Sequence, residues 1–108
     1  MELNELILII EKDVLKYIKN YDLNALARFL EGYLTNKQLM QIPLTKQEFS
    51  FKLEFSSWLL NYYNESVSNR GWVGLILFYN NGSHKDAINE FFKLYKMWRL
   101  EFERGLAQ

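Results

Sequence analysis

The sequence lacks several residue types on which common functions depend. It has no cysteine, which excludes disulfide bonds and thiolate zinc sites. It has one proline, Pro43, and one histidine, His84, so no second imidazole is available to complete a nucleophilic triad. Thirteen Lys and Arg balance thirteen Asp and Glu. The zero net charge argues against direct nucleic-acid binding, which requires a basic face.

No stretch has the length or composition of a membrane span or a targeting signal. The aliphatic run Leu6–Ile10 is bounded by Glu5 and Glu11, and it is too short to cross a bilayer. It also lacks the basic segment and cleavage site of a signal peptide. We therefore expect a cytoplasmic protein with no membrane partner.

The residues that are present predict one helical domain spanning residues 1–108. Hydrophobic residues make up 49% of the chain and aromatic residues 17%, which is enough for a core without metal or disulfide support. Apolar residues recur at helical spacing, so we predict an all-α bundle of about five helices. The expected helices cover residues 3–20, 23–36, 46–64, 71–79 and 84–103.

The helix expected over residues 46–64 is the predicted centre of the bundle. Thr45 and Glu48 form a capping box at its start. It carries two apolar stripes on nearly opposite sides, and a helix packed between neighbours shows this pattern. One stripe contains Phe51, Phe55, Trp58 and Tyr62, and the other contains Phe49, Leu53 and Leu60.

Residues 71–80 and Gly32 are two features that do not follow directly from the helical repeat. Residues 71–80 form an apolar run that fits either a buried strand or a short helix, and periodicity alone leaves both open. We favour a helix ended by Asn80-Asn81-Gly82, because no second strand exists to pair with it. Gly32 lies inside a predicted helix, where we expect it to permit close approach of a neighbouring helix.

The chemical motifs of enzymes are missing from the sequence. His84 stands alone at a predicted helix start, and the carboxylates are scattered singly rather than paired. No Glu-x-x-His metal motif or glycine-rich phosphate loop occurs. We therefore expect no catalytic residue, no metal, no cofactor and no enzyme activity.

Several residues are candidates for a protein interface. Tyr, Trp and Arg dominate such interfaces, since they combine apolar area with a polar group. Polar residues on the one polar sector of the central helix must also reach solvent. The candidates are Glu54, Asn61, Tyr63, Tyr79, Trp98 and Arg99.

Four segments follow one another in an order that resembles a known family. They are Leu26-Ala-Arg-Phe29-Leu30-Glu-Gly32-Tyr33, Phe51-Lys-Leu-Glu-Phe55-Ser-Ser-Trp58-Leu59, Gly71-Trp72-Val-Gly-Leu75-Ile76 and Ala87-Ile-Asn-Glu-Phe91-Phe92-Lys-Leu94. This order, over residues 23–95, resembles the small all-helical cognate immunity proteins of bacterial polymorphic-toxin and contact-dependent growth inhibition loci. Many members carry Arg-Pro-Gly-Met-Tyr before the first segment, where this chain has Tyr17-Ile-Lys-Asn-Tyr21.

The resemblance implies an antitoxin that binds a cognate toxin domain, such as a nuclease, and neutralises it stoichiometrically. The matched residues specify the fold, so the resemblance locates no toxin-binding surface. A monomer or weak homodimer is expected. Two alternatives remain open: a helical interaction or self-associating regulatory module without catalysis, and a small helical enzyme or ligand carrier built on the aromatic core.

Overall fold

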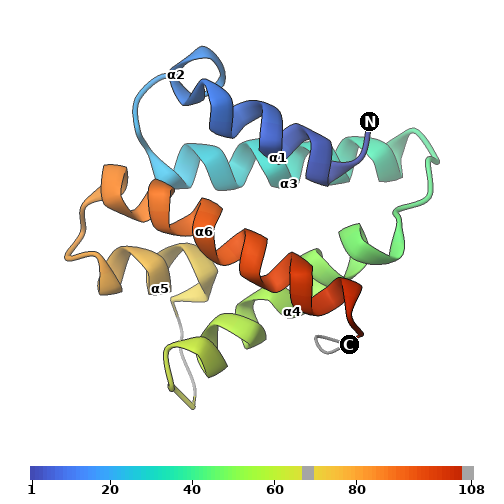
Figure 1. The fold of residues 1–108 in the computed structure, drawn as a ribbon. Helices are drawn as coiled ribbons and strands as arrows, with labels where there is room; N and C mark the ends of the chain where they lie inside the picture. Colours follow the sequence, from blue (N-terminus) through green and yellow to red (C-terminus); the bar gives the residue numbers. More distant parts are fainter. Residues whose placement is uncertain (67–69, 106–108) are drawn as a thin grey trace.

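The computed structural model describes residues 1–66 and 70–105, and in these residues it contains six α-helices and no strand (Figure 1). This confirms the predicted all-α class. The first predicted helix is divided at Asp13, whose backbone leaves the helical region at φ −155° and ψ 79°. The helices are α1 (Leu3–Lys12), α2 (Val14–Tyr17), α3 (Leu23–Leu39), α4 (Lys46–Tyr62), α5 (Gly71–Tyr79) and α6 (His84–Glu103).

The helix starts follow from local side-chain chemistry. The Asp22 carboxylate accepts hydrogen bonds from the N–H groups of the first turn of α3, and the Ser83 hydroxyl does the same for α6. Thr45 and Glu48 form both bonds of the predicted capping box. These three caps set the starts of the three longest helices.

Residues 71–79 are helical, as we favoured. Asn81 and Gly82 adopt left-handed conformations with φ of 55° and 77°. The N–H of Gly82 donates to the carbonyl of Leu77 at 2.8 Å, which closes the last turn of α5. The run is apolar because α5 packs against three neighbouring helices, α3, α4 and α6.

The buried centre of the molecule is α6. It contacts α3, α4 and α5, and in Figure 1 it runs between α1 and α3 on one side and α4 and α5 on the other. Tyr95 and Lys96 also donate hydrogen bonds to α1, at Asn4 and Glu11. Its buried residues are Ala87, Ile88, Phe91, Phe92, Leu94, Tyr95 and Trp98.

The prediction that residues 46–64 form the buried centre is therefore wrong. Phe51, Phe55 and Leu59 of α4 are buried, but the second stripe faces outward. Phe49 is 54% exposed and Leu53 is 58% exposed. One apolar face of α4 lies on the rest of the molecule, and no described helix covers the other.

The expectation for Gly32 is also wrong. A β-carbon at this position would meet no atom within 4 Å, and the residue is exposed on α3. No other helix in residues 1–66 and 70–105 approaches closely there. Glycine costs a helix about 1 kcal/mol of stability relative to alanine, and packing does not compensate for this loss at Gly32.

Glu48 is a buried carboxylate that links three helices. It accepts hydrogen bonds from the N–H of Leu3 at 2.9 Å, from the N–H of Thr45 at 2.9 Å and from Lys37 Nζ at 2.7 Å. Burial by itself raises the pKa of Glu48, but these donors outweigh it, so the pKa is lowered from its ordinary value of 4.5. The charged carboxylate of Glu48 therefore holds the start of α1 against α3 and α4.

His84 has a structural role in this arrangement. Its Nδ1 accepts a hydrogen bond of 3.0 Å from the N–H of Leu23, the first residue of α3. The imidazole at the start of α6 therefore satisfies a backbone donor at the start of α3.

Replacing His84 by alanine is expected to lower the free energy of unfolding by about 1 kcal/mol, because the Leu23 N–H loses its acceptor. Urea unfolding measures this loss. Asn89→Ala is the control, since Asn89 is exposed on the same helix and its change should stay within about 0.5 kcal/mol. A stability equal to the parent's would contradict the assigned bond.

Candidate functional site

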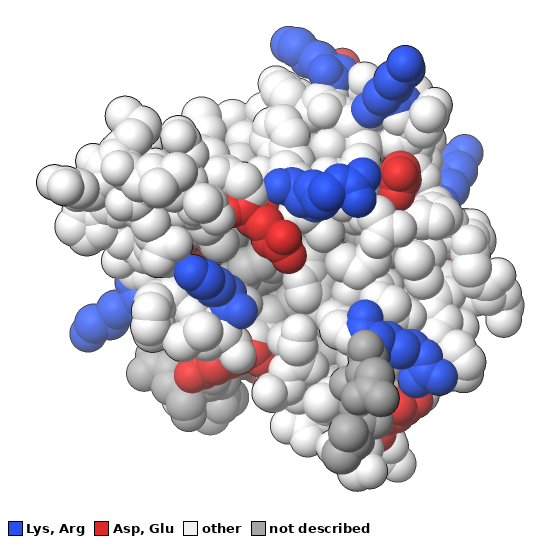
Figure 2. All heavy atoms as spheres, turned by 180° about the vertical axis from the view of Figure 1, so that it is seen from behind, with Lys and Arg blue, Asp and Glu red and all other residues white. Residues whose placement is uncertain are grey.

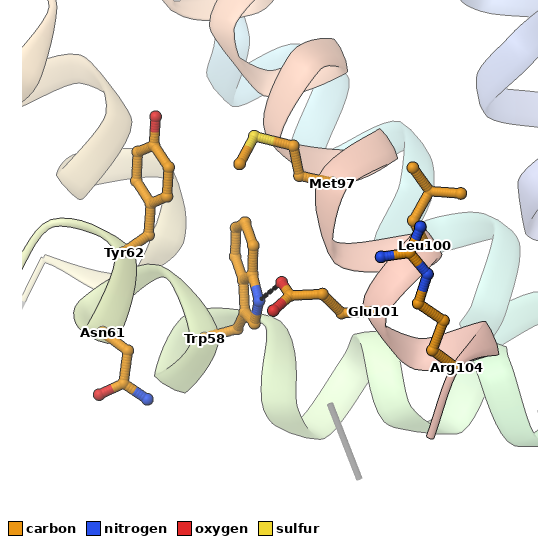
Figure 3. Close-up of a pocket in the computed structure, with 7 residues that line it drawn as sticks. All are labelled: Trp58, Asn61, Tyr62, Met97, Leu100, Glu101 and Arg104. Atoms are coloured by element: carbon orange, nitrogen blue, oxygen red, sulfur yellow. Dashed lines mark hydrogen bonds between the residues drawn. The ribbon is translucent and has the colours of Figure 1, made fainter. Parts of the chain in front are cut away.

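An open groove with a volume of about 560 Å³ lies between the second halves of α4 and α6 (Figure 3). Figure 3 shows Trp58 and Tyr62 on the α4 side and Met97 and Leu100 on the α6 side. The lining residues are Trp58, Asn61, Tyr62, Met97, Leu100, Glu101 and Arg104.

Helical spacing places these side chains on the groove. Residues 58, 61 and 62 share one face of α4, and residues 97, 100, 101 and 104 share one face at the end of α6. The Trp58 ring stacks on the buried Phe55 ring with 6.1 Å between centroids. The groove is therefore supported by the hydrophobic core.

The groove exposes apolar side chains of the types that are enriched in protein interfaces. Tyr62 is 40% exposed and Leu100 is 47% exposed, and Met97 is also exposed. Interface cores are enriched in Tyr, Trp, Met and Arg. Methionine also adapts its shape to a partner because it is unbranched.

Two charged residues line the groove, and they differ in their bonding. The Trp58 indole N–H donates a hydrogen bond to Glu101, which ties α4 to α6 across the groove. The backbone N–H of Arg104 donates to the carbonyl of Leu100 at 3.1 Å, but its guanidinium forms no hydrogen bond or ion pair with any residue in the described part of the chain. In Figure 3 its guanidinium turns back towards Leu100. One oxygen of the carboxylate therefore has a partner, whereas the guanidinium has none in the described residues and can bind an external anion.

A row of aromatic rings continues from the groove towards α5. Trp58 stacks on Tyr62 with centroids 5.6 Å apart, and Tyr62 meets Tyr63 edge-on at 5.0 Å. Tyr63 stacks on Tyr79 at 4.1 Å with the planes 3° apart. Phe78 follows at 5.1 Å and is exposed. The groove and the end of α5 are thereby joined by contacting aromatic side chains.

The two inner tyrosines differ in hydrogen bonding. The Tyr79 hydroxyl donates to Glu65. The Tyr63 hydroxyl is buried, and no residue in the described ranges bonds to it. Burial, with a smaller contribution from the Glu90 carboxylate, raises the pKa of Tyr63 above its ordinary value.

The structure brings together three of the six predicted interface residues. Asn61 lines the groove, and Tyr63 and Tyr79 belong to the row of rings beside it. Glu54 lies apart, in a small hollow with Phe49 and Phe102, where it accepts a hydrogen bond from Ser50.

The remaining two candidates lie elsewhere on α6. Trp98 is 0% exposed, so it belongs to the core and offers no surface to a partner, which corrects its assignment. It falls on the inward stripe of α6 together with Phe91 and Tyr95. Arg99 donates to Asn4 at 3.0 Å and contacts Glu103 at 3.3 Å, outside the groove.

Sequence reasoning missed most of the groove. It assigned Trp58 and Tyr62 to the core stripe, and it did not consider Met97, Leu100, Glu101 or Arg104 as site residues. One signal was available: these four residues repeat at positions i, i+3, i+4 and i+7, on a face of α6 separate from the core stripe.

Other kinds of site are not seen in the described residues. Residues 1–66 and 70–105 hold no group of three or more His, Asp and Glu side chains arranged for a metal ion. No helix in that part of the chain combines the length and apolar character needed to cross a membrane. On the face in Figure 2, basic and acidic side chains are interspersed rather than gathered by sign.

Comparison with family models, curated proteins and solved structures finds no match to this chain. The groove's chemistry and the order of the sequence segments are therefore the basis for inferring function. Exposed aromatic and aliphatic side chains beside a free cation suit recognition of another protein's side chains.

Proposed function

We propose that the protein is a bacterial immunity protein that binds a cognate toxin domain in the cytoplasm and neutralises it stoichiometrically, without catalysis. The observation that carries this proposal is the exposed groove between α4 and α6, with Trp58, Tyr62, Met97 and Leu100 on its walls. The order of sequence segments that resembles immunity proteins supports the same reading.

The groove favours binding over catalysis for a physical reason. Exposed, contiguous apolar surface rimmed by polar groups marks sites where another molecule docks. The aromatic rings also lose little conformational freedom on binding, because contacts with neighbouring rings already hold them. With zero net charge, attraction to a partner has to be local.

A second candidate function is self-association as a regulatory module. The observation that favours it is the outward stripe of α4, where Phe49 and Leu53 are more than half exposed. This stripe is separate from the residues that line the groove. Analytical ultracentrifugation of the purified protein distinguishes a monomer from a dimer formed through this stripe.

The direct test of the immunity function is co-expression with the toxin domain encoded immediately upstream. We expect growth rescue, co-purification of the two chains and a calorimetric stoichiometry of one to one. An unrelated toxin domain is the control and should not be neutralised. Failure to bind or rescue against every neighbouring toxin domain would refute the proposal, and protection at far below equal amounts would indicate an enzyme.

A further inference from the structure

We propose that the groove between α4 and α6 is the toxin-binding surface, and that it receives an apolar side chain of the toxin with a carboxylate next to it. Tyr62, Leu100 and Met97 would contact the apolar side chain, and Arg104 would bind the carboxylate. This inference rests on the proposed immunity function and adds the binding surface and the chemistry of the partner segment.

The form of the groove fits a protein segment better than a small molecule. Small-molecule sites enclose most of their ligand's surface. This groove is open along one side, with Tyr62 and Leu100 each exposed by 40% or more. An occupant would be covered on one face only, as happens when a segment of a larger protein lies in a groove.

The charges in the groove select an acidic partner segment. Glu101 keeps its negative charge, but one of its two oxygens accepts a hydrogen bond from the Trp58 indole, so fewer acceptor sites remain for an external cation. The guanidinium of Arg104 has no partner in the described residues, and a guanidinium can bind a carboxylate through two parallel hydrogen bonds. Asn61 lies on the opposite wall, and its side-chain amide forms no hydrogen bond with any described residue, so it is available to a partner at the edge of the groove. A basic segment would instead face an unpaired arginine.

The test measures the affinity of the full chain for the upstream toxin domain by calorimetry at two salt concentrations. Tyr62→Ala and Arg104→Glu change the groove. Phe49→Ala and Arg28→Glu are matched controls, because they remove an exposed aromatic ring from another face of α4 and reverse an exposed arginine on α3. Circular dichroism and thermal unfolding verify that all four variants fold.

We expect Tyr62→Ala and Arg104→Glu each to weaken binding by about 30-fold or more, as alterations at interface hot spots do. The controls should bind within about threefold of the parent, since surface residues outside an interface contribute little. The Arg104→Glu loss should shrink at high salt and be recovered by an Asp→Lys or Glu→Lys change in the toxin segment.

Each other outcome overturns a defined part of the proposal. If the parent protein neither binds nor rescues, the proposed function fails and this inference fails with it. If the parent binds and the groove variants bind equally well, the function stands and the surface is wrong. If Tyr62→Ala weakens binding but Arg104→Glu does not, the acidic character of the partner segment is wrong. If Tyr62→Ala abolishes only a dimer of this chain, the occupant is a second copy.

Discussion

Replacing Trp98 by alanine is expected to lower the free energy of unfolding by about 3–5 kcal/mol, because the change leaves a large cavity in the core. Trp98 is completely buried, and its ring contacts those of Phe51, Phe55 and Phe102 at centroid distances of 5.6, 6.0 and 5.6 Å. Its indole N–H has no partner in the described residues, so the loss comes from packing rather than from a hydrogen bond.

Trp58→Ala is the matched control for this prediction. Trp58 is only partly buried, so its truncation should cost about 1–2 kcal/mol, less than full burial of an aromatic side chain contributes. Urea unfolding followed by circular dichroism measures both variants. If Trp58→Ala were as destabilising as Trp98→Ala, α4 rather than α6 would carry the centre of the core.

The helices and their ends could be predicted because the forces that set them are local. The Thr45–Glu48 capping box and the Asn81-Gly82 stop of α5 each depend on a few consecutive residues. The inward face of α6 also follows from its apolar repeat, since residues 88, 91, 92, 95 and 98 recur at helical spacing and are all buried. These features do not depend on which other helix is the neighbour.

The choice of central helix could not be predicted because it depends on where the neighbours lie. Both stripes of α4 are apolar, and the sequence gives no sign that only the stripe of Phe51 and Phe55 meets another helix. The same ambiguity led Trp98 to be considered an interface residue and Trp58 a core residue. Aromatic side chains occur in both settings, so residue type does not separate them.

The groove could not be predicted from one helix alone. Its walls come from residues 58–62 and 97–104, which are far apart in the sequence. The bond between Trp58 and Glu101 spans 43 positions. Periodicity describes each helix separately, so it can indicate an exposed stripe on α6 but cannot show which residues of α4 face it.

Replacing Glu48 by alanine is expected to lower the free energy of unfolding by about 3–5 kcal/mol, the usual loss when one partner of a buried ion pair is removed. The change removes the acceptor of the Leu3 and Thr45 N–H groups and leaves the Lys37 ammonium, which is 13% exposed, without its partner. Glu54→Ala is the control. Glu54 is exposed on the same helix and, among the described residues, accepts only from Ser50, so its change should stay within about 0.5 kcal/mol.

The contribution of Glu48 should also depend on pH in a defined direction. Its pKa in the folded protein is lowered from the ordinary value of 4.5, so unfolding raises its affinity for a proton. The stabilisation is therefore fully present above pH 4.5, and it is lost as the pH falls through the lowered value. We expect the stability difference between the parent and Glu48→Ala to be constant from pH 6 to 8 and to narrow below pH 4.5, as measured by urea unfolding at each pH. A difference that stays the same down to pH 2.5 would show that Glu48 does not act through its charge, and that the three hydrogen bonds hold equally well when it is protonated.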